Sequence, residues 1–331
     1  MQKFNFLFFL LISSLFSREI YKEIRLVIED GNTIEVLQSE HLGIDHFHIT
    51  DDWIQFVIPS QKIIELEEKS LDFSIIHEDI ESYYASRLDN NYEARDFELG
   101  SMGGYYTFAE IEEQLDKLFL EYPAIITEKV SLGLTLEGRD IWMVKVSDNP
   151  ELDENEPEVL YTGLHHSREP MSYMNLFYFI HWLGENYNVD PEATALVNGR
   201  EMYFIPAINP DGLVYNQQIA PNGGGMQRKN MRDSCLGNPT GVDLNRNYSY
   251  MWGYDNQGSS PDGCNETYRG TLPFSEPETQ VVKSFVESRD FKIALNYHSY
   301  SNLLIYPFGY DPDIPVPDED FEIFVEYGEI M

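Results

Sequence analysis

The segment TGLHHSREPM, residues 162–171, places two histidines, an arginine and a glutamate within five consecutive positions. Its first three residues complete the apolar run EVLYTGL, which predicts a buried strand with polar residues at its carboxyl end. His166 and Glu169 are three residues apart, a spacing that suits either two ligands of one metal ion or a hydrogen-bonded pair on one helical face. The spacing alone leaves both interpretations open.

Strand and helix patterns alternate on both sides of this segment. Apolar and β-branched runs predict further strands at 140–147, 201–208 and 292–299. Helical spacing predicts helices at 106–123, 171–187 and 276–288, the first with a threonine cap and a proline at its end. Nearly continuous apolar strands are typical of a sheet covered on both faces. We therefore expect an α/β fold, with a mixed, largely parallel sheet between layers of helices, an α/β/α sandwich.

A second polar cluster, HSYS at residues 298–301, follows another of the predicted central strands. Ligand sites in α/β sheets lie beyond the carboxyl ends of strands. Hydrolytic zinc sites commonly take three protein ligands and leave a fourth position for water. His166, Glu169 and His298 would supply two imidazoles and one carboxylate, a set that lowers the pKa of water and polarises a carbonyl when zinc is bound.

The composition excludes several classes of protein. The 331 residues include 57 acidic and 22 basic side chains, for a net charge of −35, which repels nucleic acid and anionic membrane surfaces. Hydrophobic residues make up 42% of the chain and aromatic residues 14%. These fractions indicate a globular protein with a substantial core and not a disordered chain.

The first 17 residues, MQKFNFLFFLLISSLFS, combine one lysine with an apolar run. The run is too short to span a bilayer and fits a signal peptide, so we expect export and no membrane association once residues 1–17 are removed. A buried N-terminal strand is the alternative interpretation. In an exported protein the two cysteines, Cys235 and Cys264, are candidates for a disulfide bond.

Residues 18–95 predict a small α+β unit. Strand patterns occur at 23–30, 33–37, 53–59 and 71–79. One helical pattern, at 60–70, begins with Ser60 as a candidate N-cap. A polar, aperiodic stretch follows, and its last part, residues 96–104, is the predicted linker to the larger region from residue 105 onward.

Taken together, the motifs resemble the zinc metallocarboxypeptidases of the pancreatic carboxypeptidase A/B and bacterial carboxypeptidase T kind. The resemblance begins near residue 105 and rests on LEGRDIWMVKVS, HHSREP, INPDG, QRKN, GVDLNRNY and NYHSYS, in this order. It implies that His166, Glu169 and His298 bind one Zn²⁺ per chain. It makes His165 a neighbour that orients the loop.

The resemblance also implies roles for other polar residues. Arg228 matches the catalytic cation that stabilises the oxyanion, and Asn245 with Arg246 matches the clamp for the C-terminal carboxylate of the substrate. Arg168 and Tyr300 match residues that line the substrate cleft. An ordinary solvated charge is the alternative interpretation for each arginine.

Family members that are secreted carry a small α+β pro-domain, which covers the cleft until a protease cuts the linker. Residues 18–95 resemble such a pro-domain in size and pattern, and Arg87 and Arg95 offer trypsin-like cleavage points. A permanent accessory domain is the alternative interpretation. Cys235 and Cys264 occupy positions similar to those of a disulfide bond in animal members of the family.

The family's general base, a glutamate on a late strand, has no match in this sequence. Glu322, Glu326 and Glu329 instead belong to the charged face of an amphipathic helix predicted in EDFEIFVEYGEIM, residues 319–331. The resemblance therefore implies that residues 105–331 correspond to a catalytic domain without about its last quarter. We expect these residues alone to be inactive.

The sequence thus predicts a secreted, monomeric zinc carboxypeptidase zymogen, extracellular or periplasmic, that is activated by another protease. Its substrates would be peptides or proteins with a free C-terminus. Two alternatives remain: a non-catalytic protein that binds zinc and peptide C-termini, and a related amidase that acts on cell-wall peptides.

Overall fold

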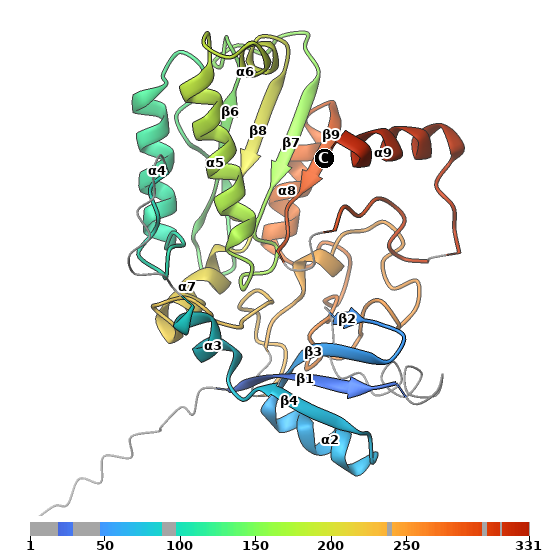
Figure 1. Ribbon diagram of the computed structural model, residues 1–331. Coiled ribbons are helices and arrows are strands. Elements are labelled where there is room, and N and C mark those ends of the chain that lie inside the picture. The colour runs from blue at the N-terminus through green and yellow to red at the C-terminus, as the bar shows by residue number, and fades with distance from the viewer. Residues whose placement is uncertain are drawn as a thin grey trace, which may run out of the picture.

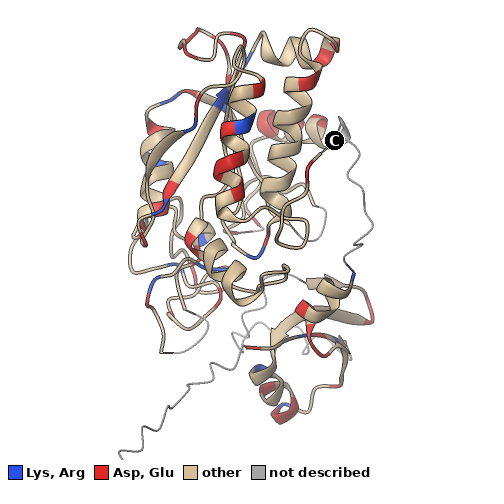
Figure 2. Cartoon of the chain, turned by 90° about the vertical axis from the view of Figure 1, so that its left-hand side faces the viewer, with Lys and Arg blue, Asp and Glu red and all other residues tan. Residues whose placement is uncertain are grey.

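The computed structural model describes residues 19–28, 47–87, 97–236, 240–299, 303–311 and 313–330. Two sheets form the framework of this part of the chain, a small one near the N-terminus and a larger one between helices (Figure 1). Acidic side chains are spread over both parts and are not gathered in one patch (Figure 2). No helix within the described residues is both long and apolar enough to cross a bilayer. The predicted signal peptide lies outside them.

The N-terminal sheet is antiparallel, in the order β2-β3-β1-β4. Its strands are β1 (Tyr21–Val27), β2 (Phe47–Ile49), β3 (Trp53–Pro59) and β4 (Phe73–His77). Alternate side chains of β1 and β3 pack with α2 (Ile63–Glu68) in a small core of Ile24, Leu26, Ile54, Phe56, Ile58, Ile63 and Leu66. The strands predicted at 23–30, 53–59 and 71–79 are confirmed, and the one at 33–37 lies outside the described residues.

The predicted N-cap at Ser60 is wrong. Ser60 is already the first residue of a 3₁₀ turn, η1 (Ser60–Lys62), whose N-cap is Pro59 and which has no side-chain cap. The Ser60 N–H donates to the carbonyl of Ile20 at 2.8 Å, which ties the residue to the end of β1. A helix that the sequence did not predict, α3 (Ile80–Ser86), follows β4, with Asp79 as its N-cap.

The larger sheet has the order β5-β6-β8-β7-β9. Its strands are β5 (Val130–Leu134), β6 (Asp140–Val146), β7 (Glu158–Thr162), β8 (Glu201–Ile205) and β9 (Phe291–Asn296). β6 pairs antiparallel with β5 and β8, whereas β7 pairs parallel with β8 and β9. The mixed α/β architecture is confirmed, and the described strands of this larger sheet form two parallel and two antiparallel pairs.

Helices cover both faces of this sheet. On one face, α4 (Phe108–Glu121) and α5 (Met171–Asn186) pack on alternate residues of β6 and β8, including Val144, Val146, Met202 and Phe204 (Figure 1). On the other, α8 (Pro277–Glu287) packs on the intervening residues Ile141, Met143, Tyr203 and Ile205. The threonine cap of α4 is confirmed, because Thr107 and Glu110 form a reciprocal capping box. The remaining helices are α6 (Pro191–Val197), α7 (Pro210–Ile219) and α9 (Asp318–Ile330).

Residues 97–104 of the predicted linker are ordered against the larger region. Isolated bridges join Gly100 to Gly104 and Met102 to Tyr105. The side chain of Met102 is buried and belongs to the core beneath α4 and α5. The position of residues 97–104, where the chain joins the larger region, is therefore fixed by packing. Arg95, the second predicted cleavage point, lies outside the described residues.

The register of β7 and β9 places the two polar clusters together. Thr162 pairs with Asn296 at the carboxyl ends of these parallel neighbours, and their side chains contact at 3.0 Å. The HHSREP loop begins three residues beyond Thr162, and His298 lies two residues beyond Asn296. Both clusters therefore leave the same edge of the sheet.

The structure pairs Cys235 with Cys264, which are 29 positions apart. Replacing both by serine in the full chain is expected to lower the free energy of unfolding by about 3–4 kcal/mol, because the bond restrains the loop in the unfolded state. Urea unfolding of the two proteins measures this difference. Ser249→Ala, at an exposed position, serves as a control with no expected effect. Two titratable thiols in the denatured, unreduced protein would contradict the bond.

Candidate metal centre and substrate cleft

The loop after β7 turns sharply at Leu164. This residue has a φ of 56°, in the left-handed region that side chains with a Cβ rarely adopt. Its N–H donates to Ser172 Oγ at 3.0 Å, and its carbonyl accepts from the N–H of Asn209 at 3.1 Å. These bonds from two helix N-termini hold the turn, after which His165 and His166 contact different partners.

Three donor atoms converge beyond the strand ends. His166 Nδ1 lies 2.7 Å from Glu169 Oε1, and His298 Nδ1 lies 2.8 Å from Glu169 Oε2. The two Nδ1 atoms are 3.1 Å apart. The structure thus brings together the three residues that the sequence analysis selected as ligands.

The donor set fits zinc. Tetrahedral zinc with bonds of about 2.0–2.2 Å separates its ligand atoms by about 3.3 Å, close to the observed spacing. Two imidazole nitrogens and a carboxylate also direct their lone pairs at one point. Such lone pairs repel one another and are stabilised when a cation lies between them. Within the described residues, two other groups of acidic side chains have similar spacing, but both consist of carboxylates alone.

Asp243 supports this cluster, although the sequence analysis did not single it out. It is fully buried, and its Oδ1 lies 3.2 Å from His166 Nε2. Burial raises the pKa of Asp243, but the charge of Arg228 and the contact with His166 outweigh this effect and hold the pKa well below its ordinary value. A buried carboxylate behind a ligand histidine fixes the orientation of the ring. The sequence feature that could have identified Asp243 is its position in GVDLNRNY, before a 3₁₀ turn that it caps.

Arg228 lies between Asp243 and the donor cluster. Its Nε and Nη2 donate to Asp243 Oδ2 at 3.1 and 2.8 Å, and its Nη1 is 3.9 Å from Glu169 Oε1. The side chain is 1% exposed. The sequence-predicted catalytic cation is therefore next to the three donor atoms, and two of its nitrogens are fixed by a buried carboxylate.

Asn245 and Arg246 lie in the turn η2 (Leu244–Arg246), directly after Asp243. Asn245 Nδ2 is 3.4 Å from His298 Nε2. Arg246 donates from Nε to the carbonyl of Gly258 at 2.7 Å and from Nη1 to that of Asn245 at 3.2 Å. Backbone carbonyls thus orient the guanidinium beside the cluster. Tyr300, also predicted to bind substrate, lies outside the described residues.

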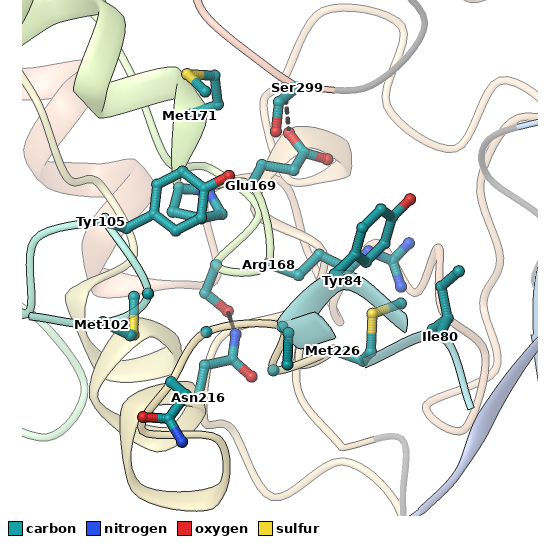
Figure 3. A pocket seen from close by; sticks show the side chains of 18 of the residues that line it. Ile80, Tyr84, Met102, Tyr105, Arg168, Glu169, Met171, Asn216, Met226 and Ser299 are labelled. Atoms are coloured by element: carbon teal, nitrogen blue, oxygen red, sulfur yellow. Dashed lines mark hydrogen bonds between the residues drawn. The ribbon is translucent and has the colours of Figure 1, made fainter. Parts of the chain in front are cut away.

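Arg168 points away from the donor cluster toward the N-terminal unit. Its Nη1 is 4.0 Å from Glu266 Oε2, and its side chain lines a cavity of about 420 Å³ (Figure 3). Ile80 and Tyr84 of α3 line the same cavity, together with Glu169 and Ser299. The Ser299 N–H donates to Glu169 Oε2 at 3.3 Å. The N-terminal unit therefore forms one wall of a cavity that reaches the donor cluster.

α3 also packs closely on the loop at residues 223–225. Gly224 has a φ of 90°, and a Cβ built on it would lie 3.4 Å from the Cα of Glu81. Glu81 is 3% exposed. A glycine is needed here for the backbone conformation, and it permits the close approach of the helix.

His165 is adjacent to the cluster but is not part of it. Its Nε2 shares a hydrogen bond of 2.7 Å with the hydroxyl of Tyr248. Burial lowers the pKa of His165 to about 3, with further lowering by His298 and His166, so the imidazole is neutral at physiological pH.

The chain is similar to known proteins in sequence. Residues 111–328 match the family described as zinc carboxypeptidase. Carboxypeptidase A1 of Mus musculus is 32% identical over 261 residues, which are 77% of this chain and 59% of that protein. A zinc carboxypeptidase of Saccharothrix mutabilis subsp. capreolus is 35% identical over 223 residues, 66% of this chain and 50% of that protein. The chain therefore spans between half and three fifths of the length of these two relatives.

The fold is shared with a solved structure. The crystal structure of carboxypeptidase A from Helicoverpa armigera superposes with a TM-score of 0.75 at 22% identity, and covers 94% of this chain and 77% of that one. The superposition supports the arrangement of sheet and helices.

Replacing His298 by alanine is expected to weaken zinc binding by more than about 100-fold, because one of three donor atoms is removed and removal of even an outer partner costs 10–100-fold. Competition with a chromophoric chelator measures the affinity. His48→Ala, at an exposed position of β2, is the matched control. Retention of one tightly bound zinc per chain by the His298 variant would contradict the assignment.

Proposed function

The chain belongs to the zinc carboxypeptidase family, and we propose that it is a zinc-dependent metallocarboxypeptidase that releases C-terminal amino acids from peptides. The observation that carries the proposal is the convergence of His166 Nδ1, His298 Nδ1 and the Glu169 carboxylate. One Zn²⁺ per chain would be held there, and it would supply a Lewis acid that polarises a carbonyl and lowers the pKa of water.

The surrounding side chains divide the remaining tasks. Asp243 orients His166, and burial keeps both groups away from water. Arg228 offers a positive charge beside the cluster, where an oxyanion would develop during attack on the scissile carbonyl. Its attachment to Asp243 means that this charge is in place before the reaction starts. Arg168 and Tyr300 would line the substrate cleft.

Asn245 and Arg246 would bind the C-terminal carboxylate of the substrate. Arginine pairs with a carboxylate through two parallel hydrogen bonds, which selects a free C-terminus over an amide. The contact of Asn245 with His298 supports this proposal, because recognition would then occur next to the proposed metal ligands. Recognition of the chain end and chemistry on its last peptide bond would thus take place side by side.

A peptide with a free C-terminus is expected to bind about 10–100-fold more tightly than the same peptide with a C-terminal amide, because a hydrogen bond to a charged group contributes about 1.5–3 kcal/mol. Fluorescence anisotropy of the zinc-loaded protein measures both affinities. Arg246→Gln should bind the two peptides alike, and Arg200→Gln, at an exposed position, should preserve the preference. Equal affinities in the unsubstituted protein would favour the amidase alternative.

The same mixtures of zinc-loaded protein and peptide also test where the general base lies, because release of amino acids can be measured in them. We propose that the proton acceptor is none of the glutamates of α9, since Glu322 and Glu326 are exposed on that helix. A positioned acid–base group contributes about 10²–10⁴-fold to the rate, so residues 1–331 alone would bind peptides without rapid turnover. Rapid release of amino acids, abolished by Glu322→Gln or Glu326→Gln, would show that α9 supplies the base.

We further propose that the protein is exported through residues 1–17 and acts as a monomeric zymogen in which residues 18–95 cover the cleft. The position of α3 across the cavity from Glu169 supports this role. Arg87 is the exposed C-cap of α3, where an activating protease would find a basic residue. A permanent accessory domain remains the alternative.

Limited trypsin treatment is expected to increase the affinity for a peptide of six or more residues at least tenfold, because it would remove the wall that α3 forms. Anisotropy before and after treatment measures the change. A variant with Arg87→Gln and Arg95→Gln should respond less at the same trypsin dose. An unchanged affinity after complete loss of residues 18–87 would identify an accessory domain.

A further inference from the structure

One short segment, residues 243–248, contacts the histidines of the site from behind. Asp243 Oδ1 lies 3.2 Å from His166 Nε2, and Asn245 Nδ2 lies 3.4 Å from His298 Nε2. The first contact joins a buried carboxylate to its ring. The second is long and joins only an amide. On the Nε2 side, His166 is therefore held by a carboxylate, whereas His298 contacts an amide there.

His298 is also the more exposed of the two rings. Its side chain is 25% accessible, against 3% for His166, and it stands two residues beyond the end of the edge strand β9. A second amide, that of Asn296, contacts its Nε2 at 3.0 Å. Its ring orientation consequently needs support from packing as well as from hydrogen bonds.

Two histidine rings pack near that of His298. The ring of His166 is tilted against it, with centroids 4.6 Å apart. The ring of His165 lies on it at a smaller inclination, with centroids 5.9 Å apart and planes inclined by 29°. The Nε2 of His165 shares its 2.7 Å hydrogen bond with Tyr248, at the far end of the same segment. The Tyr248 ring in turn packs edge-on against Phe274, with centroids 5.7 Å apart. A continuous series of contacts thus runs from Phe274 to His298.

We propose that His165 and Tyr248 form a positioning pair, which holds the imidazole of His298 in the orientation that directs its Nδ1 toward Glu169 and His166. The inference rests on the proposed zinc function, because it assigns the pair a role in metal affinity. Neither residue is among the proposed metal ligands or substrate-binding residues. The hydroxyl of Tyr248 fixes the rotation of the His165 ring, and that ring limits the rotation of His298. Without the hydroxyl, a buried nitrogen of His165 loses its partner and the ring can turn.

The test uses the full chain with Tyr248→Phe, which removes the hydroxyl and keeps the ring against Phe274. We expect zinc binding, measured by chelator competition, to weaken about tenfold, as is typical when an outer-shell partner is lost. The visible spectrum of the Co²⁺-substituted protein should shift, since the ligand geometry changes. Tyr254→Phe removes a more exposed hydroxyl, bonded to Asp311, from the neighbouring segment and is the matched control.

A cycle with His165→Phe separates positioning from general stability. His165→Phe should also weaken zinc binding, because it leaves the Tyr248 hydroxyl without its partner. The double variant should lose little more than either single variant, since replacement of both partners by apolar rings leaves no unpaired polar group. Urea unfolding of the metal-free proteins gives the stability change independently of the metal.

The outcomes are distinct. If the unsubstituted chain binds no zinc, the proposed function and this inference are both wrong. If it binds zinc and Tyr248→Phe binds equally with an unchanged Co²⁺ spectrum, only the positioning pair is overturned. A loss of zinc affinity that is additive in the double variant and equal to the loss of metal-free stability would also overturn it, because the residues would then serve packing alone.

Discussion

The candidate site depends on one constraint, the parallel pairing of β7 with β9. The register that places Thr162 beside Asn296 brings two loops, distant in the sequence, to the same sheet edge. Two imidazole nitrogens and a carboxylate then face one another within 3.1 Å. Groups with lone pairs directed at one point are stable together when a cation or shared protons lie between them. The buried Asp243, the cation of Arg228 and the tight turn at Leu164 all serve to keep this arrangement in place.

The sequence predicted the parts of the fold in which local and long-range signals agree. Buried strands such as β7 and β8 are mostly apolar after an initial glutamate, and α4 has both a capping box and an apolar face. Some helices and strands were not predicted because their residues are compatible with more than one local structure. Asn209 and Pro210 are typical of a turn, but they also make an N-cap and a first helical residue, and the structure uses them to begin α7. β5, with a glycine near its centre, has no alternation to reveal it.

The sequence predicted those residues of the candidate site that belong to short motifs. His166, Glu169 and His298 occur at strand ends, and their residue types suit a metal, so the structure brings together residues already selected. Asp243 escaped selection because an aspartate before a turn is usually a cap, which it also is. Its second role depends on burial and on Arg228, which lies 15 positions earlier in the chain. Neither property is visible in the spacing of the motif.

The N-terminal unit and the segment at residues 243–248 lie on opposite sides of the cluster. α3 lines the cavity that reaches Glu169, while Asp243, Asn245 and Tyr248 contact the three histidines from behind. Arg246 lies within that rear segment, so binding of a carboxylate there would act on the same backbone that orients the imidazoles. A ligand can shift the geometry of a second site only if it interacts differently with two arrangements of the connecting element. The turn η2 is held by the buried side-chain cap of Asp243 and by a bond from Arg246 to the carbonyl of Gly258, so a second arrangement of the turn would have to break these contacts. The segment is therefore better suited to keep the proposed metal ligands and the proposed carboxylate-binding residues at a fixed separation than to transmit a change between them.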